Sequence, residues 1–78
     1  MLLPSLRQLL YLVALAETHH FGRAADQCNV TQSTLSAGIK ELESVLGAPL
    51  VDRTRRSVVL TPLGQDTVER ARHLIDAA

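Results

Sequence analysis

Aromatic side chains are scarce in this chain of 78 residues, which has one Phe, one Tyr and no Trp. The hydrophobic fraction is nevertheless 46%, which excludes an intrinsically disordered segment. A core must therefore be built from Leu, Val, Ile and Ala, and these side chains suit small helices that pack closely. Because the chain is near the lower size limit for a single core, it forms one folded unit at most.

Cysteine is nearly absent as well. The single residue Cys28 cannot form an internal disulfide, and a zinc-finger ligand set is not available. The longest hydrophobic run, residues 9–16, is much shorter than the roughly 18 residues of a membrane span. Arg7 and Gln8 before this run do not make a signal peptide. These absences predict a soluble protein of a reducing compartment and no membrane partner.

The chain also lacks an excess of charge of one sign, because eight Lys and Arg balance eight Asp and Glu. A nucleic-acid-binding protein is often strongly basic, so the neutral total argues mildly against this class. The distribution is uneven, however, since Arg53, Arg55 and Arg56 crowd together while Glu69 and Asp76 lie in the final segment. We therefore expect a local basic patch and a modest affinity of one isolated domain for an anionic partner.

Helical spacing of hydrophobic residues predicts a first helix over 6–17, ended by His19 and His20. Its apolar positions are Leu6, Leu9, Leu10, Val13 and Ala14. A second, short helix is expected over 22–28, preceded by Phe21 and followed by a turn in which Asn29 adopts a left-handed conformation.

A third helix should begin after the N-cap Thr31 and end at Gly47, and its two faces are unlike. The hydrophobic face carries Leu35, Ile39, Leu42 and Leu46. The opposite face carries Ser33, Ser36, Ala37, Lys40 and Ser44. An ordinary exposed face would carry long charged side chains, whereas a narrow face rich in hydroxyl groups suits a helix that enters a groove of DNA.

The pattern changes after the third helix. Residues 50–51 and 58–60 are short β-prone runs on either side of an arginine-rich segment, which predicts a hairpin with a basic tip. Thr61 and Pro62 then start a fourth helix. Its apolar positions are Val68, Ala71, Leu74, Ile75 and Ala78. Because this helix is still running at the last residue, we expect residues 62–78 to begin the remainder of a longer chain, after a domain over 1–61.

These elements and their motifs together resemble the DNA-binding domain of LysR-type bacterial transcription regulators. The motifs are Phe21 with Ala24 and Ala25, Val30 to Ser33, Leu35 and Ser36, Ile39, Leu42 with Glu43, Leu46 with Gly47, Leu50, Arg53, and Leu60 with Thr61 and Gly64. Residues 11–17, 19–26, 31–36 and 52–61 look most like the peroxide-responsive OxyR branch. In that branch the sensing cysteines belong to a C-terminal domain.

The resemblance implies a mainly α fold: a winged helix-turn-helix with a three-helix core, a two-stranded wing and a long linker helix. It implies binding to double-stranded DNA in the bacterial cytoplasm as a homodimer on an interrupted inverted repeat, with a tetramer as an alternative for the full-length protein. No cofactor is implied. The residues expected in the dimer contact are Val68, Ala71, Leu74 and Ile75.

The residues expected to contact DNA are Thr31, Gln32, Ser33, Thr34, Ser36, Ala37, Lys40, Arg53, Arg56 and Arg23. Gln32 can pair with an adenine edge in the major groove, and Lys40 can meet a phosphate. By position, the resemblance favours Arg56 for the minor groove and Arg53 for a phosphate or a structural ion pair. The chain departs from the family pattern at Ser33 and Val51. It also departs at Ala37, where some members present Arg to the DNA.

Other functions have less support. A winged-helix module that binds an acidic protein is the main rival, and a LysR-type regulator of a small metabolite is the alternative within the family. Cys28 lacks a basic neighbour and a resolving cysteine, so it is expected to be an inert packing group rather than a redox sensor. His19 and His20 point about 100° apart on a helix and form no metal site. No catalytic arrangement is discernible, so we expect no enzyme activity.

Overall fold

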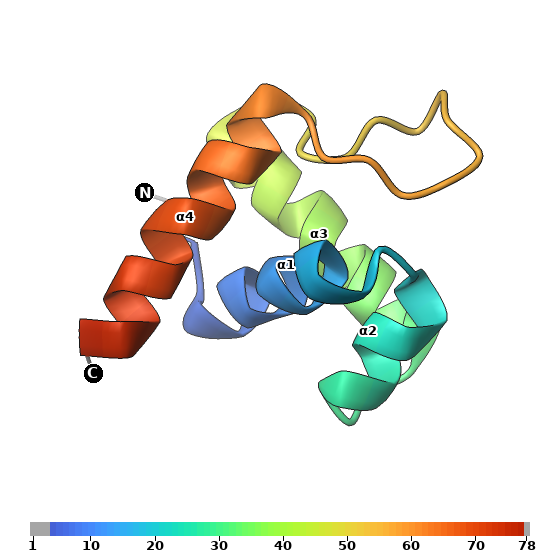
Figure 1. The fold of residues 1–78 in the computed structure, drawn as a ribbon, viewed down its shortest axis with the longest axis horizontal. Coiled ribbons are helices and arrows are strands. Elements are labelled where there is room, and N and C mark those ends of the chain that lie inside the picture. The colour runs from blue at the N-terminus through green and yellow to red at the C-terminus, as the bar shows by residue number, and fades with distance from the viewer. Residues whose placement is uncertain (1–3, 78) are drawn as a thin grey trace.

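The structure, a computed structural model, describes residues 4–77 and is mainly helical. Its elements are α1 (Leu6–Thr18), α2 (Phe21–Gln27), α3 (Gln32–Leu46) and α4 (Pro62–Ala77). Helices α1, α2 and α3 pack on one another, and α4 lies along α1. The segment between α3 and α4 projects at one end of the molecule, away from the C-terminal end of α4 (Figure 1). The four predicted helices are confirmed, while Ala78 lies outside the described residues.

The first two helices are delimited by side-chain caps. Ser5 and Gln8 form a reciprocal capping box at the start of α1. His19 ends α1 in the left-handed conformation, with a φ of 52°. Helix α2 starts and ends one residue earlier than expected, because Nδ1 of His20 accepts a hydrogen bond from the backbone N–H of Arg23 at 3.1 Å. Its N-cap is therefore His20, directly before Phe21.

The turn between α2 and α3 follows the predicted chemistry. Asn29 adopts the left-handed conformation with a φ of 58°. The Thr31 hydroxyl then caps α3 by accepting a hydrogen bond from the backbone N–H of Thr34 at 3.1 Å. Gly47 ends α3 with a φ of 76° and donates its N–H to the carbonyl of Glu43 at 2.8 Å. A helix–turn–helix thus follows from local signals alone.

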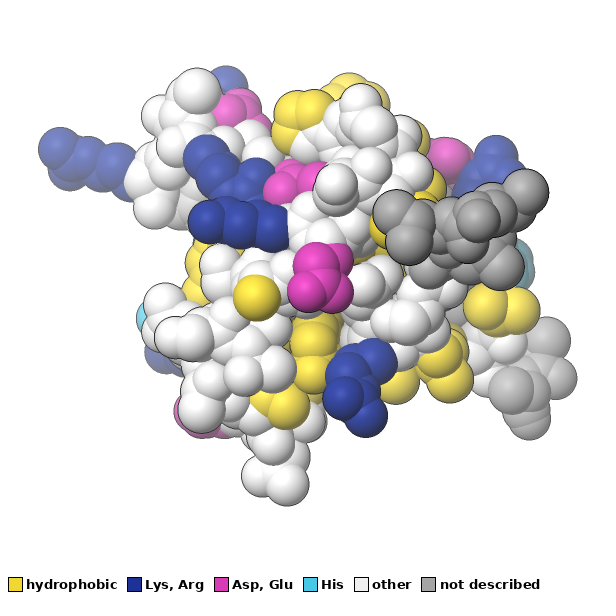
Figure 2. Space-filling view, turned by 180° about the vertical axis from the view of Figure 1, so that it is seen from behind, with side chains coloured by type: hydrophobic (Ala, Val, Ile, Leu, Met, Phe, Trp, Pro, Cys, Tyr) yellow, Lys and Arg dark blue, Asp and Glu magenta, His cyan; other side chains and the backbone are white. Residues whose placement is uncertain are grey.

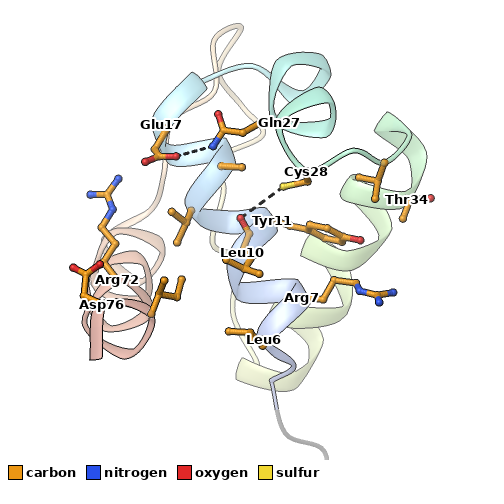
Figure 3. A pocket seen from close by; sticks show the side chains of 14 residues that line it. Leu6, Arg7, Leu10, Tyr11, Glu17, Gln27, Cys28, Thr34, Arg72 and Asp76 are labelled. Atoms are coloured by element: carbon orange, nitrogen blue, oxygen red, sulfur yellow. Dashed lines mark hydrogen bonds between the residues drawn. The ribbon is translucent and has the colours of Figure 1, made fainter. Parts of the chain in front are cut away.

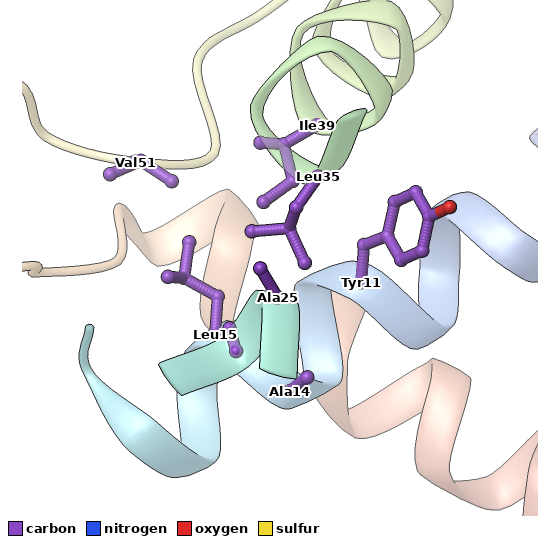
Figure 4. Packing of buried hydrophobic residues seen from close by; sticks show 8 residues of the cluster. Tyr11, Ala14, Leu15, Ala25, Leu35, Ile39 and Val51 are labelled. Carbon is purple, nitrogen blue, oxygen red and sulfur yellow. The ribbon is translucent and has the colours of Figure 1, made fainter. Parts of the chain in front are cut away.

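The core between α1, α2 and α3 is made of aliphatic side chains around Tyr11 (Figure 4). The buried members of this cluster are Tyr11, Ala14, Leu15, Ala24, Ala25, Leu35, Ile39 and Val51. A second cluster joins α1 and α3 to α4 through Leu12, Leu42, Leu50 and Val68. The face predicted for α1 is partly wrong, because Leu6 and Leu10 are exposed, and Leu46 of α3 is exposed too. Every residue of 9–16 is hydrophobic, so spacing alone cannot select the buried face.

The predicted hairpin is much less regular than expected. We call residues 50–60 the wing. Their strand pairing is a single antiparallel bridge between Val51 and Leu60, flanked by backbone hydrogen bonds from Asp52 to Val59 at 2.8 Å and from Thr61 to Leu50 at 3.0 Å. The carboxylate of Asp52 accepts the backbone N–H of Thr54 at 3.0 Å, which turns the chain away from the ladder. The wing is therefore a loop closed at its base.

Helix α4 begins as predicted, since the Thr61 hydroxyl accepts the backbone N–H of Gly64 at 3.0 Å and Pro62 occupies the first helical position. Val68 and Ala71 were expected in a dimer contact, but both are buried within the same subunit. A side chain that packs inside its own subunit has little surface left for a partner. The dimer contact stays a prediction, with Leu74 exposed and Ile75 half-buried on α4.

Candidate nucleic-acid interface

The N-terminal half of α3 presents small polar side chains to solvent. The exposed residues are Thr31, Gln32, Ser33, Thr34, Ala37 and Lys40, and Ser36 is half-buried. Thr31 donates its hydroxyl hydrogen to the Thr34 hydroxyl at 2.9 Å, so these two side chains order the first turn. The first-turn N–H groups and the positive end of the helix dipole favour a nearby anion. The predicted residues of α3 and its N-cap are therefore accessible to a partner, with Ser36 partly so.

Two basic residues flank this surface. Lys40 lies one turn beyond Ser36 and forms no ion pair with any residue of 4–77. Arg23 is exposed in the first turn of α2, and it too has no carboxylate partner in the described chain. Both side chains are free to meet a phosphate. They lie on the two helices of the helix–turn–helix.

The three wing arginines have different surroundings. Arg53 pairs with Glu43, with Nη1 and Oε2 2.9 Å apart, so the structural ion pair that the sequence left open for Arg53 is present. Arg55 lies beside Asp52 with 3.7 Å between nitrogen and oxygen. Arg56 is exposed and has no carboxylate partner among residues 4–77. Figure 2 shows basic side chains gathered at the end where the wing projects, with acidic side chains beside them.

Glu43 is an important residue of this region to which the sequence assigned no role. Its Oε2 accepts hydrogen bonds from the backbone N–H groups of Leu50 at 2.7 Å and Val51 at 3.4 Å, besides the Arg53 guanidinium. Partial burial alone would raise the pKa of Glu43, but the hydrogen bonds from Arg53 and Leu50 outweigh it, and the pKa is lowered. The sequence held one sign of this role, because Glu43 directly follows the apolar Leu42 and lies ten positions before Arg53.

Two further contacts at the wing involve residues outside the predicted set. Nδ1 of His19 lies 3.2 Å from the carbonyl oxygen of Val58, which ties the end of α1 to the returning arm of the wing. Hydrogen bonds from the hydroxyl and the backbone N–H of Thr54 lower the pKa of Asp52. The ionised Asp52 carboxylate thereby offsets part of the repulsion among the arginines.

A separate apolar groove of about 1010 Å³ lies between α1, α4 and the end of α2 (Figure 3). Leu6 and Leu10 line it and are 57% and 41% exposed. At its far end Gln27 donates to Glu17 at 2.7 Å. Cys28 also lines the groove and is half-buried. The pKa of its thiol is raised mainly by burial and secondly by the nearby negative charge of Glu17. A raised thiol pKa disfavours the reactive thiolate.

Neither a metal cluster nor a membrane-spanning helix is found in the part of the chain that the structure describes. No group of three His, Cys, Asp or Glu side chains in residues 4–77 is arranged to hold a metal ion. None of the described helices combines the length and hydrophobicity needed to cross a bilayer.

Most of the chain matches one known protein family. The model of bacterial regulatory helix-turn-helix proteins of the lysR family matches residues 6–65. The chain belongs to the LysR family. This LysR-family domain is 63% identical to the HTH-type transcriptional regulator EstR of Acinetobacter baylyi over 73 residues, which cover 94% of the chain and 24% of EstR. It is 51% identical to the DNA-binding transcriptional dual regulator OxyR of Escherichia coli over 71 residues, covering 91% of the chain and 23% of OxyR.

A solved structure of Vibrio fischeri DarR in complex with DNA matches the fold of this LysR-family domain with a TM-score of 0.90 and 36% sequence identity. The match covers 99% of the chain and 26% of that protein. The mainly α winged helix-turn-helix fold predicted from the sequence is thereby confirmed. The chain spans about a quarter of the length of the relatives it matches.

Proposed function

We propose that this LysR-family domain binds double-stranded DNA by sequence, with α3 in the major groove and the wing beside the minor groove. The observation that carries the proposal is the exposed, slender polar surface of α3, together with the exposed Arg56 of the wing, which has no carboxylate partner among residues 4–77. Gln32 can read an adenine edge, while Ser33 and Ser36 reach phosphates or a thymine methyl group. The structure of DarR with DNA supports this arrangement by similarity of fold.

Lys40, Arg23 and Arg56 are proposed to contact the sugar–phosphate backbone, and Arg56 also to enter a narrow minor groove. Such contacts position the protein and make its affinity depend on salt, because each neutralised phosphate releases counterions. Ala37 adds no hydrogen bond, so base reading depends mainly on Gln32 and the hydroxyl side chains. The domain would act in the bacterial cytoplasm, where the chromosome lies.

We further propose a homodimer. Leu74 is 58% exposed on α4. Helix α4 of a second copy, packed against α4 of the first, would bury Leu74 and serve as the linker helix that follows the domain of residues 1–61. One recognition helix reads only a few base pairs, each worth about 1–3 kcal/mol. A dimer reads both halves of an interrupted inverted repeat and gains the discrimination that one copy lacks.

The experiment is a selection of duplexes from a random library, followed by gel shifts over a salt titration. The logarithm of affinity should fall linearly with the logarithm of salt concentration. Gln32→Ala should relax the preference at one base position, whereas Lys40→Ala should weaken all sequences alike. Arg70→Ala, which removes the same charge from α4, is the matched control and should change little. A protein-binding module would show no such salt dependence, which would defeat the proposal.

For the full-length protein, we propose a peroxide-responsive regulator of the OxyR type, supported by the 51% identity to OxyR. The second candidate is a LysR-type regulator that responds to a small metabolite, and the 63% identity to EstR, whose name does not mention peroxide, leaves room for it. Peroxide should leave DNA binding of the present chain unchanged, since the thiol of Cys28 is half-buried with a raised pKa. Addition of peroxide should change the DNA footprint of the full-length protein if it is an OxyR-type regulator. The footprint should stay the same if the protein responds to a small metabolite.

A further inference from the structure

We infer that Glu43 is a positioning residue that couples the wing to the recognition helix and so places Arg56 against the DNA. This inference rests on the proposed DNA-binding function and adds to it a determinant that does not itself touch DNA. Glu43 lies in α3, and all three groups that it binds through one oxygen belong to the first arm of the wing: Leu50, Val51 and Arg53.

The geometry makes this a firm attachment. The Glu43 side chain is only 12% exposed, and its shortest contacts are 2.7 Å to the Leu50 N–H and 2.9 Å to the Arg53 guanidinium. Hydrogen bonds from charged or buried donors to a carboxylate are among the stronger ones in proteins. The attachment therefore fixes the direction in which the chain leaves α3.

The rest of the wing has few other attachments. Its arms are joined by the Val51–Leu60 bridge, Val58 accepts the His19 contact, and Val51, Val58 and Leu60 pack on the core. Residues 53–57 between the arms are exposed and add nothing to the core. The orientation of the tip thus depends on groups at its base. Leu50 and Val51 of the first arm pack in the core with Leu35, Ile39 and Leu42 of α3, and Glu43 adds hydrogen bonds and an ion pair from α3 to the same arm.

The two possible effects of the Glu43 charge on DNA affinity have opposite signs, so an experiment can tell them apart. An acidic residue near a DNA-binding surface repels phosphates, so removing its charge should strengthen binding if charge alone matters. If Glu43 instead holds the wing in place, removing its charge should weaken binding. Glu41 provides the matched control, because it lies on the same helix, is exposed, and contacts Gln8 of α1 rather than the wing.

The test compares Glu43→Gln with Glu41→Gln on a fluorescent duplex of about 30 base pairs, selected by the wild-type chain and long enough for two half-sites. Glu43→Gln should weaken binding about threefold to tenfold, whereas Glu41→Gln should leave it unchanged or strengthen it. Arg56→Ala should also weaken binding, and adding Glu43→Gln to Arg56→Ala should change the affinity by less than about twofold.

Footprinting separates wing placement from a general loss of stability. Glu43→Gln should lose hydroxyl-radical protection in the minor groove while keeping methylation protection of guanines in the major groove, which reports α3. Equal loss of both protections, or a gain in affinity, would overturn the inference. If Arg56→Ala has no effect on binding, the wing part of the proposed function fails instead, so the two failures can be told apart.

Arg53→Gln serves as a second variant that keeps the backbone bonds of Glu43, in case Glu43→Gln does not fold. As part of the attachment, Arg53 should affect minor-groove protection without changing the salt dependence of binding. If Arg53 instead contacts a phosphate, Arg53→Gln should reduce the magnitude of the slope of log affinity against log salt by about one. A slope lowered by that amount with intact minor-groove protection contradicts the inference.

Discussion

The ring of Tyr11 lies against Gly38, so that a Cβ atom at position 38 would be only 2.6 Å from Cδ2 of the ring. This contact brings α1 and α3 together beside the proposed DNA-binding surface. Glycine here weakens the helix by up to about 1 kcal/mol relative to alanine, yet it permits the close approach. The position of the recognition helix therefore depends on the absence of a side chain.

Gly38→Ala should destabilise the domain by about 1–3 kcal/mol despite the better helix propensity of alanine, because the ring must move. Urea unfolding followed by circular dichroism measures the effect. Ser44→Ala, at an exposed position of the same helix, is the control and should be nearly neutral. The double variant Gly38→Ala with Tyr11→Leu should be less perturbed than the sum of both changes. A more stable Gly38→Ala chain would show that the ring is not confined.

Thr31→Ala should cost about 1 kcal/mol of stability, because it removes the acceptor for the backbone N–H of Thr34. Thr31→Ser retains a capping hydroxyl and should behave nearly as the wild type. If Thr31 also contacts a phosphate, Thr31→Ala should weaken DNA binding by more than Thr31→Ser even under conditions where both variants are fully folded. Equal melting temperatures of the wild type and Thr31→Ala would contradict the capping role.

The stability of the chain should depend on pH through Glu43. Its pKa is lower in the folded chain than in the unfolded chain, so ionised Glu43 stabilises the fold above its unfolded-state pKa. That contribution is lost as the pH falls through its folded-state pKa. The difference in unfolding free energy between the wild type and Glu43→Gln should therefore be constant near neutral pH and change in favour of Glu43→Gln from about pH 5 to pH 2. A difference that stays constant over the acid range would be inconsistent with the lowered pKa.

Leu74→Arg should weaken self-association at least about tenfold if α4 meets a second copy, because it places a charge in an apolar contact. Since Leu74 is exposed, the fold of the single chain should be unaffected. Sedimentation equilibrium measures the association, and thermal unfolding of the dilute chain gives the control. Glu69→Arg, at another exposed position of α4, should associate as the wild type. Unchanged association of Leu74→Arg would place the dimer contact elsewhere.

The sequence by itself determined the helices and, to within one residue, the limits of α1 and α2, because these depend on contacts within a few residues. The hydroxyl of Thr31, the left-handed Asn29 and the terminating Gly47 all act on the adjacent backbone, and each was found as predicted. The exposed polar surface of α3 was also predicted, since the periodicity of one helix separates its apolar and polar faces.

Only the tertiary structure decided which apolar residues are buried and which charges are paired. Leu6 and Leu10 satisfy the helical pattern as well as Leu12 and Leu15 do, and the position of α2, α3 and α4 alone selects the second pair for the core. Val68 and Ala71 could have met a partner or the chain's own α1, and the fold uses them internally. The attachment of the wing to Glu43 joins residues seven to ten positions apart across a turn, and no local propensity specifies such a contact.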